Sequence, residues 1–507
     1  MRFKYKLIMS VFSFLIMNHA FAVGTFIPAP NRVDMVHDFK RNLIYISNGG
    51  QVLRYDVSSG QLLSPFDVGG SLSGMDISPD GSTLAVADKI RSDTELWVHL
   101  IDLNTNAVSQ LIFPRGFYEG GTFTVVYSGN GELLVTSQFE GSGWVPLRRH
   151  EFESNTTTQL ASVRQNSMLT SSGDLMNIAI AESNSSAGPF SNYDVANQLL
   201  NSGPGTGWFN YEIGVNHNGT QFSVPTYGGT FVYGENFEPM GVIGVYAGPQ
   251  PIGVVYHPAE NIVYYAWRGS SEVRAYDTQT LTQTTAYDFE YNFVHNGNYA
   301  FVNGRLKTAA DGSILLATVG GGVQFLQLYS PLTAQSSSVT TDENTAIAVA
   351  LNAQVGNGGE VAYIVTDPPE NGSLSGLAPD LVYTPNDNFS GPDSFAYQAR
   401  YGKASVQAVV DISVKAVNNN PVAVDDVANL FRKKVIIDVL SNDYDVDGDS
   451  LSIVDFTQPS NGRVYLLSDG SIYYRAYRRR VDFDSFEYTV SDGNGGSATA
   501  TVVVNYQ

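Results

Sequence analysis

The chain contains 507 residues, with 49 Asp and Glu against 28 Lys and Arg, a formal net charge of −21 and no cysteine. A chain of this length is expected to fold as several domains, and its acidic surplus excludes a protein built to bind the phosphate backbone of a nucleic acid. The absence of cysteine excludes disulfides, thiol catalysis and thiolate metal sites.

The first 22 residues have the organisation of a signal peptide. Three basic residues precede an apolar run from Leu7 to Met17, and Ala20-Phe21-Ala22 supplies the small-x-small site that signal peptidase cleaves. The run is shorter than the ~18 to 20 residues of a membrane-spanning helix, and no later stretch reaches that length. We therefore expect an exported protein without a membrane span, either extracellular, on the cell surface or periplasmic.

Residues 23 to 331 repeat a unit made of a short strand, a tight turn and an apolar strand, most clearly at Asp76 to Val86. Strand signals dominate and no long helical period occurs, which predicts an all-β fold. The turns recur about every 45 residues, a spacing typical of β-propeller blades. We predict seven blades, or six or eight if a terminal copy is misread, with residues 24 to 33 supplying the strand that closes the ring.

The propeller motifs also resemble those of a known superfamily. The Ser78-Pro79-Asp80-Gly81 hairpin, the Leu84 to Val86 strand and the Tyr55 to Gly60 turn are similar to those of the seven-bladed propellers of the surface-layer YVTN and quinoprotein-amine-dehydrogenase-like superfamily. This resemblance implies a fold rather than an activity. The lactonases and cofactor-dependent dehydrogenases of this fold are an alternative, but none of their functional residues matches here position by position.

The histidines show no metal-binding or catalytic spacing. Three fall on predicted hairpin turns and three are isolated: His37, His217 and His257, then His99, His150 and His295. There is no HExxH motif and no histidine pair at metal spacing, which argues against a zinc hydrolase. We therefore expect a non-catalytic protein, and no catalytic residue is assigned.

Aromatic residues in glycine-rich loops are the candidate ligand-binding residues of the propeller. By blade register these loops open on one face, and the candidates are Trp144, Trp208, Trp267, Arg268, Tyr118 and Arg91. Flat aromatic surfaces beside hydrogen-bonding side chains stack on sugar rings, and exposed tryptophan is costly without a partner. The alternative is that each tryptophan fills the gap between adjacent blades.

The C-terminal third contains two copies of one module, at residues 332 to 416 and 417 to 507. Asp393-Ser394-Phe395-Ala396-Tyr397 returns as Asp484-Ser485-Phe486-Glu487-Tyr488, and alternating strands with Asn-Gly and Asp-Gly turns predict two small antiparallel sandwiches. These motifs resemble the cadherin-like, Ig-like repeats, also called tandem-95 repeats, of bacterial surface and adhesion proteins.

This resemblance implies a calcium site in the second repeat, where acidic and amide side chains crowd between Asn442 and Leu451. The implied ligands are Asp443, Asp445 and Asp447, with Asp425, Asp426, Asp449 and Asp492 to complete the shell. Ca²⁺ takes six to eight hard oxygen ligands. In the first repeat Leu351 to Glu360 has lost most of these acids, and Glu343 matches only the acid at the start of such modules. We therefore expect one Ca²⁺ site, the alternative being a solvated acidic turn.

Together these features predict a secreted, monomeric, non-catalytic binding or adhesion protein. A propeller recognition head is carried on a calcium-stiffened stalk and binds a carbohydrate or protein of a cell surface or matrix. Nucleic acid is not an expected partner.

Overall fold

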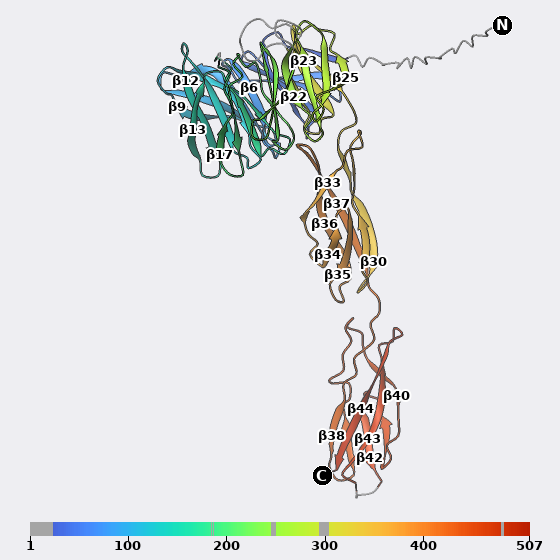
Figure 1. The fold of residues 1–507 in the computed structure, drawn as a ribbon. Coiled ribbons are helices and arrows are strands. Elements are labelled where there is room, and N and C mark those ends of the chain that lie inside the picture. The colour runs from blue at the N-terminus through green and yellow to red at the C-terminus, as the bar shows by residue number, and fades with distance from the viewer. Residues whose placement is uncertain are drawn as a thin grey trace, which may run out of the picture. The chain divides into compact units, whose positions relative to one another are not determined.

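A computed structural model of the chain describes residues 24–183, 185, 187–244, 250–293, 304–477 and 481–506 (Figure 1). Throughout these ranges every regular element is a strand, so the predicted all-β class is confirmed. No helix long and apolar enough to cross a membrane occurs in the described ranges. The predicted signal peptide and His295 lie outside the described residues.

The strands gather into two compact units. The first unit contains the chain up to Ala334 together with Ala353–Ala362 and Ala399–Val406, and the second contains Gln335–Asn352, Tyr363–Gln398 and the chain from Gln407 onward. Two short segments of the first repeat are therefore part of the propeller unit.

Seven four-stranded antiparallel sheets form the propeller in the part of the chain that the structure describes. The first three blades are β2 (Arg32–Asp38), β3 (Leu43–Asn48), β4 (Gln51–Asp56), β5 (Gln61–Asp67); β6 (Leu72–Ile77), β7 (Thr83–Arg91), β8 (Glu95–Asp102), β9 (Val108–Pro114); and β10 (Glu119–Tyr127), β11 (Leu133–Phe139), β12 (Trp144–Glu151), β13 (Thr156–Arg164). The next three are β14 (Met168–Ser171), β15 (Asn177–Ala181), β16 (Phe190–Asp194), β17 (Leu199–Ser202); β18 (Gly214–Val215), β19 (Gln221–Thr226), β20 (Gly229–Gly234), β21 (Pro239–Ile243); and β22 (Pro251–Tyr256), β23 (Ile262–Trp267), β24 (Glu272–Asp277), β25 (Gln283–Asp288).

The seventh blade closes the ring with strands from both ends of the propeller. It contains β26 (Leu306–Thr308), β27 (Ile314–Val319), β28 (Gly322–Gln327) and, as its outermost strand, β1 (Thr25–Pro28). Strand β1 runs antiparallel to β28, with Thr25 opposite Phe325 and Pro28 opposite Gly322. The predicted blade number and the predicted closing strand are both confirmed.

The repeated turn and apolar strand of the sequence define each blade. In the clearest copy the Asp80 carboxylate accepts a hydrogen bond from the Ser82 N–H at 3.0 Å, and Gly81 takes the positive φ of the turn. The strand that follows is buried on both faces: Leu84 packs toward the preceding blade and Ala85 toward the next. This strand is the second of its blade, and the first strands lie against one another around the central channel, as β2, β6 and β10 do.

Each repeat is a sandwich of a four-stranded and a three-stranded sheet in which the first strand runs parallel to the last. The first repeat contains β30 (Ser337–Asp342), β37 (Ala404–Lys415), β36 (Gly391–Tyr401), β33 (Ala362–Asp367) and β31 (Ile347–Ala350), β35 (Asp380–Pro385), β34 (Gly372–Leu377), beside the pair β29 (Thr333–Gln335) and β32 (Asn352–Gln354). The second contains β38 (Asp426–Leu430), β44 (Ser497–Tyr506), β43 (Phe483–Ser491), β40 (Ser452–Phe456) and β39 (Lys434–Ile437), β42 (Ile472–Ala476), β41 (Gly462–Leu466).

The aspartate of the repeated Asp-Ser-Phe-x-Tyr motif has the same role in both repeats. In the second repeat the Tyr474 hydroxyl donates to the Asp484 carboxylate at 2.7 Å, and the Asn461 N–H donates to it at 3.0 Å. In the first repeat Tyr383 donates to Asp393 at 2.8 Å. Because both tyrosine rings are buried, this carboxylate satisfies donors that would otherwise have no partner.

Candidate functional site

Blade connectivity defines two faces of the propeller. In each blade the first strand ends at the repeated hairpin turn, so these turns lie on one face, which we call the turn face. The loops between second and third strands and the connections between blades lie on the opposite face, the loop face. All six predicted ligand-binding residues belong to loop-face segments: Arg91, Tyr118, Trp144, Trp208, Trp267 and Arg268.

Two of these residues, Tyr118 and Trp144, are exposed, and Tyr118 contacts an exposed neighbour that sequence reasoning missed. Phe117 is 85% exposed, and its ring centroid lies 4.1 Å from that of Tyr118. Trp144 is 56% exposed and lies beside the Arg164 guanidinium, 5.5 Å from its ring centroid. Phe117 directly precedes Tyr118 in the same connection between blades. Its position beside a predicted ligand-binding residue would have been enough to predict it from the sequence.

Ion pairs hold the loops that carry these aromatic side chains. Arg91 and Arg115 both pair with the Glu140 carboxylate, Arg115 at 3.0 Å. Below them the buried Arg148 and Glu119 pair at 2.5 Å. Burial alone would raise the pKa of Glu119, but the hydrogen bond and charge of Arg148 hold that pKa below its usual value. Arg91, which the sequence predicted to bind a ligand, therefore forms an ion pair that fixes the loop.

The remaining predicted aromatic residues differ in exposure. Trp208 is half-buried, and its ring centroid lies 6.2 Å from that of Tyr227, which in turn lies 6.0 Å from the Arg268 guanidinium. Trp267 is only 7% exposed and packs in the core between two blades, with the Arg274 guanidinium 4.3 Å from its ring centroid. Trp267 thus fills an inter-blade gap, the alternative that the sequence left open.

The acidic residues of the second repeat separate into two groups. In the first group Asp445, Asp447 and Asp449 each offer a carboxylate oxygen within 4.8 Å of the others. The Asn419 N–H donates to Asp447 at 2.6 Å, and the Asn419 side-chain amide donates to Glu343 at 2.7 Å. Glu343, for which the sequence showed no partner, therefore connects to this group through the linker.

Asp492 borders the same group. The Asn494 amide donates to Asp449 at 2.7 Å, while the Asn494 N–H donates to Asp492 at 2.8 Å. The Asn418 amide also donates to Asp492 at 2.7 Å, and this bond and the backbone donors of the loop lower the pKa of Asp492. A carboxylate held this way stays ionised near neutral pH.

The second group surrounds Tyr488. The Tyr488 hydroxyl donates to Asp443 at 3.0 Å, and the Thr501 N–H donates to Asp425 at 2.7 Å. Burial raises the pKa of Asp426, and the negative charge of Asp443 raises it further. Asp443 and Asp425 thus accept hydrogen bonds outside the group of Asp447, while the Oδ2 atom of Asp426 is buried without a hydrogen-bond partner among the described residues.

A cavity of about 170 Å³ lies at the turn-face end of the propeller channel, and sequence reasoning did not predict it. A hairpin between β36 and β37 borders it. The Lys403 N–H donates to the Ala310 carbonyl at 2.7 Å, and the Tyr401 hydroxyl donates to Glu260 at 2.5 Å. Gly402 has φ +61°, and a Cβ there would lie 2.8 Å from the Ala310 oxygen, so the turn suits glycine alone.

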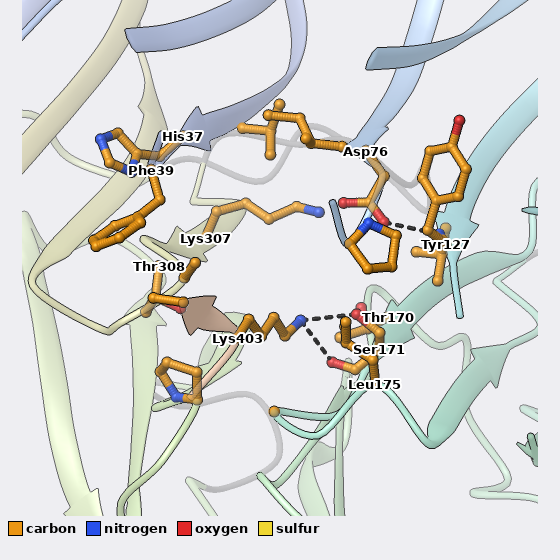
Figure 2. Close-up of a pocket in the computed structure, with 18 of the residues that line it drawn as sticks. His37, Phe39, Asp76, Tyr127, Thr170, Ser171, Leu175, Lys307, Thr308 and Lys403 are labelled. Carbon is orange, nitrogen blue, oxygen red and sulfur yellow. Dashed lines mark hydrogen bonds between the residues drawn. The ribbon is translucent and has the colours of Figure 1, made fainter. Parts of the chain in front are cut away.

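The Lys403 side chain points into this cavity (Figure 2). Its ammonium donates to the Ser171 hydroxyl at 2.7 Å and to the Ser171 carbonyl at 3.1 Å. Burial lowers the pKa of Lys403 to about 8, although the negative charge of Asp76 partly opposes this shift.

Asp76 and Lys307 line the cavity on other blades (Figure 2). The Tyr127 N–H donates to the Asp76 carboxylate at 2.9 Å, and burial raises the pKa of Asp76. The Lys307 ammonium points into the same space, and no hydrogen bond or ion pair to another described residue engages it.

A buried ion group lies deeper in the channel. Arg305, two residues before Lys307 on the chain, donates to Asp34 at 2.6 Å and also to Glu212. Burial raises the pKa of Glu212 from its usual 4.5 to about 7, although the positive charge of Arg305 opposes this shift. Burial would also raise the pKa of Asp34, but Arg305 outweighs it and keeps this pKa low.

Comparison with known proteins identifies the C-terminal modules. Residues 330–413 and 418–505 match the bacterial Ig domain family. The two repeats are bacterial Ig domains. The Ig-like assignment made from the motifs is confirmed. The chain is also 38% identical over 96 residues to Protein GAMETE EXPRESSED 2 of Arabidopsis thaliana, a match that covers 18% of this chain and 10% of that protein.

Solved structures similar to the chain include three propellers or propeller-containing proteins. The RRP9 WD40 repeats share 14% identity at a TM-score of 0.47 and cover 60% of this chain and 97% of that one. The propeller domain of Cps50 (Swd1) from Myceliophteria thermophila shares 9% sequence identity at a TM-score of 0.45. The match covers 60% of this chain and 99% of that one. Hydrazine synthase of Kuenenia stuttgartiensis shares 12% sequence identity at a TM-score of 0.44. The match covers 60% of this chain and 97% of that one.

Proposed function

We propose that the chain is an exported, non-catalytic binding protein whose loop face holds a carbohydrate or protein of a cell surface or matrix. The observation that carries this proposal is that three large aromatic side chains on loop-face segments are exposed: Phe117, Tyr118 and Trp144. Large aromatic side chains in water are costly, and they dominate the binding energy of protein and sugar interfaces. The Glu140 ion pairs reduce the entropy lost when a ligand immobilises these loops.

The described histidines support a non-catalytic role because three of them hold hydrogen bonds to neighbouring residues within the fold. His99 is buried 3.0 Å from Asp88, His150 contacts the Thr157 hydroxyl at 2.9 Å, and His257 contacts a tyrosine hydroxyl. Burial lowers the pKa of His257 to about 4, despite the opposing charge of Glu260. Such a neutral, enclosed imidazole is suited to structure rather than to proton transfer at neutral pH.

The loop-face proposal is tested by binding of the mature protein to an array of cell-surface and matrix polysaccharides and to immobilised matrix proteins. We expect the Phe117→Ala, Tyr118→Ala, Trp144→Ala triple variant to lose at least about 30-fold in affinity, because a single hot-spot residue contributes about 2 kcal/mol or more. The control is Phe431→Ala with Tyr477→Ala, which removes exposed aromatic side chains from the second repeat. Unchanged binding by the triple variant contradicts the proposal.

We also propose that one Ca²⁺ binds at Asp445, Asp447 and Asp449 and stiffens the tandem repeats. The Oδ2 atom of Asp445 is buried without a hydrogen-bond partner in the described residues, which a cation would satisfy. Glu343 and Asp492 supply further carboxylate oxygens nearby through the contacts of the linker asparagines. Oxygen-only ligand sets of this kind suit Ca²⁺.

Calorimetric titration of the metal-free protein with Ca²⁺ tests this site. We expect a single binding event and a gain of about 2.7 kcal/mol in the stability of the repeats at 100 times the Kd. Asp445→Asn with Asp447→Asn should abolish both effects. The matched control, Asp438→Asn with Asp455→Asn, removes the same charge from exposed positions and should leave them intact. A flat titration of the wild type rules out the metal.

A further inference from the structure

We propose that the cavity at the turn-face end of the propeller channel binds a small oxyanion, a carboxylate or a phosphate, between Lys307 and Lys403. This site is separate from the loop face and from the acidic group of the second repeat, and it does not depend on the function proposed for either.

The donors of the cavity exceed its acceptors. A lysine ammonium carries three N–H donors. Lys403 uses two acceptors, both from Ser171, and Lys307 contacts none among the described residues. Both lysines are half-buried, and an ammonium that is partly withdrawn from bulk water without acceptors is costly. An oxyanion between the two lysines supplies the missing acceptors and the opposite charge.

Asp76 does not already fill this role. The ammonium nitrogens of Lys307 and Lys403 both lie more than 4.0 Å from the Asp76 carboxylate oxygens, too far for an ion pair. The Asp76 carboxylate accepts a hydrogen bond from the Tyr127 N–H instead. Burial raises the pKa of Asp76, although the positive charges of Lys307 and Lys403 oppose this shift. When ionised, the Asp76 carboxylate repels an anion bound between the lysines, so removing its charge should strengthen binding.

The walls limit the size of the ligand. The Arg305 ion group forms the deep end of the cavity, since Glu212 lines it, and the hairpin residues Lys403 to Ser405 border the outer end. The exposed residues Lys40 and Asp80 also line the cavity, so it reaches solvent beside the hairpin. A volume of about 170 Å³ compares with the ~10 to 15 Å³ that one water requires on the same measure, which leaves room for a ligand of a few non-hydrogen atoms.

Titration calorimetry of the full mature protein at constant ionic strength, with malonate in one arm and inorganic phosphate in the other, tests the site. We expect saturable binding of at least one probe, and the stronger arm identifies the ligand chemistry. Lys307→Met should weaken binding by about tenfold or more, because it removes a charge-assisted hydrogen bond. Asp76→Asn should strengthen binding several-fold, because it removes the opposing charge.

Two controls separate this site from general charge effects. Lys433→Met removes the same charge from an exposed position of the second repeat and should leave binding unchanged, and Lys307→Arg should retain most of it. The proposal is overturned if neither probe binds saturably up to about 10 mM. It is also overturned if Lys307→Met binds like Lys433→Met, or if Asp76→Asn weakens binding.

Discussion

Replacing Arg305 with methionine lowers the free energy of unfolding of the propeller by about 3 to 5 kcal/mol. Arg305, Asp34 and Glu212 are each almost fully buried in the channel. Among the described residues, Arg305 is the cation that forms ion pairs with both carboxylates. The substitution removes both ion pairs and leaves Asp34 and Glu212 only the more distant positive charge of Lys307. A buried carboxylate without a partner is among the most destabilising groups a fold can contain.

The stability lost in the Arg305→Met variant should increase as the pH rises. Glu212 already has a pKa of about 7 against its usual 4.5, mainly through burial. A carboxyl group whose pKa is raised on folding stabilises the fold below the unfolded pKa, and that contribution is lost as the pH rises through the folded pKa. Without Arg305 the pKa of Glu212 rises further, so the Arg305→Met variant should lose more stability at pH 8 than at pH 5.

Tryptophan fluorescence during guanidinium denaturation measures this loss selectively. All four tryptophans of the chain lie in the propeller, at positions 97, 144, 208 and 267. Lys40→Met is the control, because it removes the same charge from an exposed propeller position and should change stability by less than about 1 kcal/mol.

A triple variant distinguishes lost charge pairing from lost packing. Asp34→Asn, Glu212→Gln and Arg305→Met together leave no unpaired buried charge, so this protein should be more stable than Arg305→Met alone. If the triple variant is as unstable as the single one, the packing of the arginine stem rather than its charge stabilises the channel.

The elements that were predictable from sequence are those fixed by local, repeated chemistry. A tight polar turn like Asp80-Gly81, followed by an apolar strand, recurs with varied residues along the propeller, because each blade needs a similar hairpin and a doubly buried strand. The Asp393 and Asp484 motifs likewise recur because each carboxylate satisfies a buried tyrosine hydroxyl within its own repeat. Periodicity makes such local requirements visible in a single sequence.

The channel was not predictable because its contacts join distant parts of the chain. Arg305 and Asp34 are 271 positions apart, and Lys403 and Ser171 are 232 apart. A weak signal did exist, since Arg305 directly precedes β26 and Lys307 lies two positions later within it, the spacing at which side chains of an extended chain point to the same side. In an acidic chain, two cations directed toward a propeller axis indicate a charged channel.

The acidic loop shows a different limit of sequence reasoning. Asp443, Asp445 and Asp447 alternate along the chain, and their spacing alone assigns them to one group. The structure separates them, since Asp443 turns toward Tyr488 while the other two lie with Asp449. The direction of each side chain in an irregular loop depends on tertiary partners, which the spacing does not encode.

Replacing Tyr401 with alanine should lower the stability of the propeller by about 3 kcal/mol, although this residue belongs to an Ig repeat. Its ring is 5% exposed and packs with Leu332 and Val355 in a core that also includes propeller residues such as Ala310. Its hydroxyl contacts Glu260 and Asn357. The alanine variant leaves a cavity and removes both contacts.

The same tryptophan fluorescence assay measures the effect, because the repeats contain no tryptophan. Tyr401→Phe keeps the ring and loses only the hydroxyl contacts, so it should cost about 1 kcal/mol. Tyr477→Ala removes an exposed ring of the second repeat and should leave the signal within about 0.5 kcal/mol of the wild type. An unchanged fluorescence midpoint in Tyr401→Ala would show that the hairpin rests on the propeller without stabilising it. A shift in the expected order instead makes the hairpin at Ala399–Val406 an integral, stabilising part of the propeller unit.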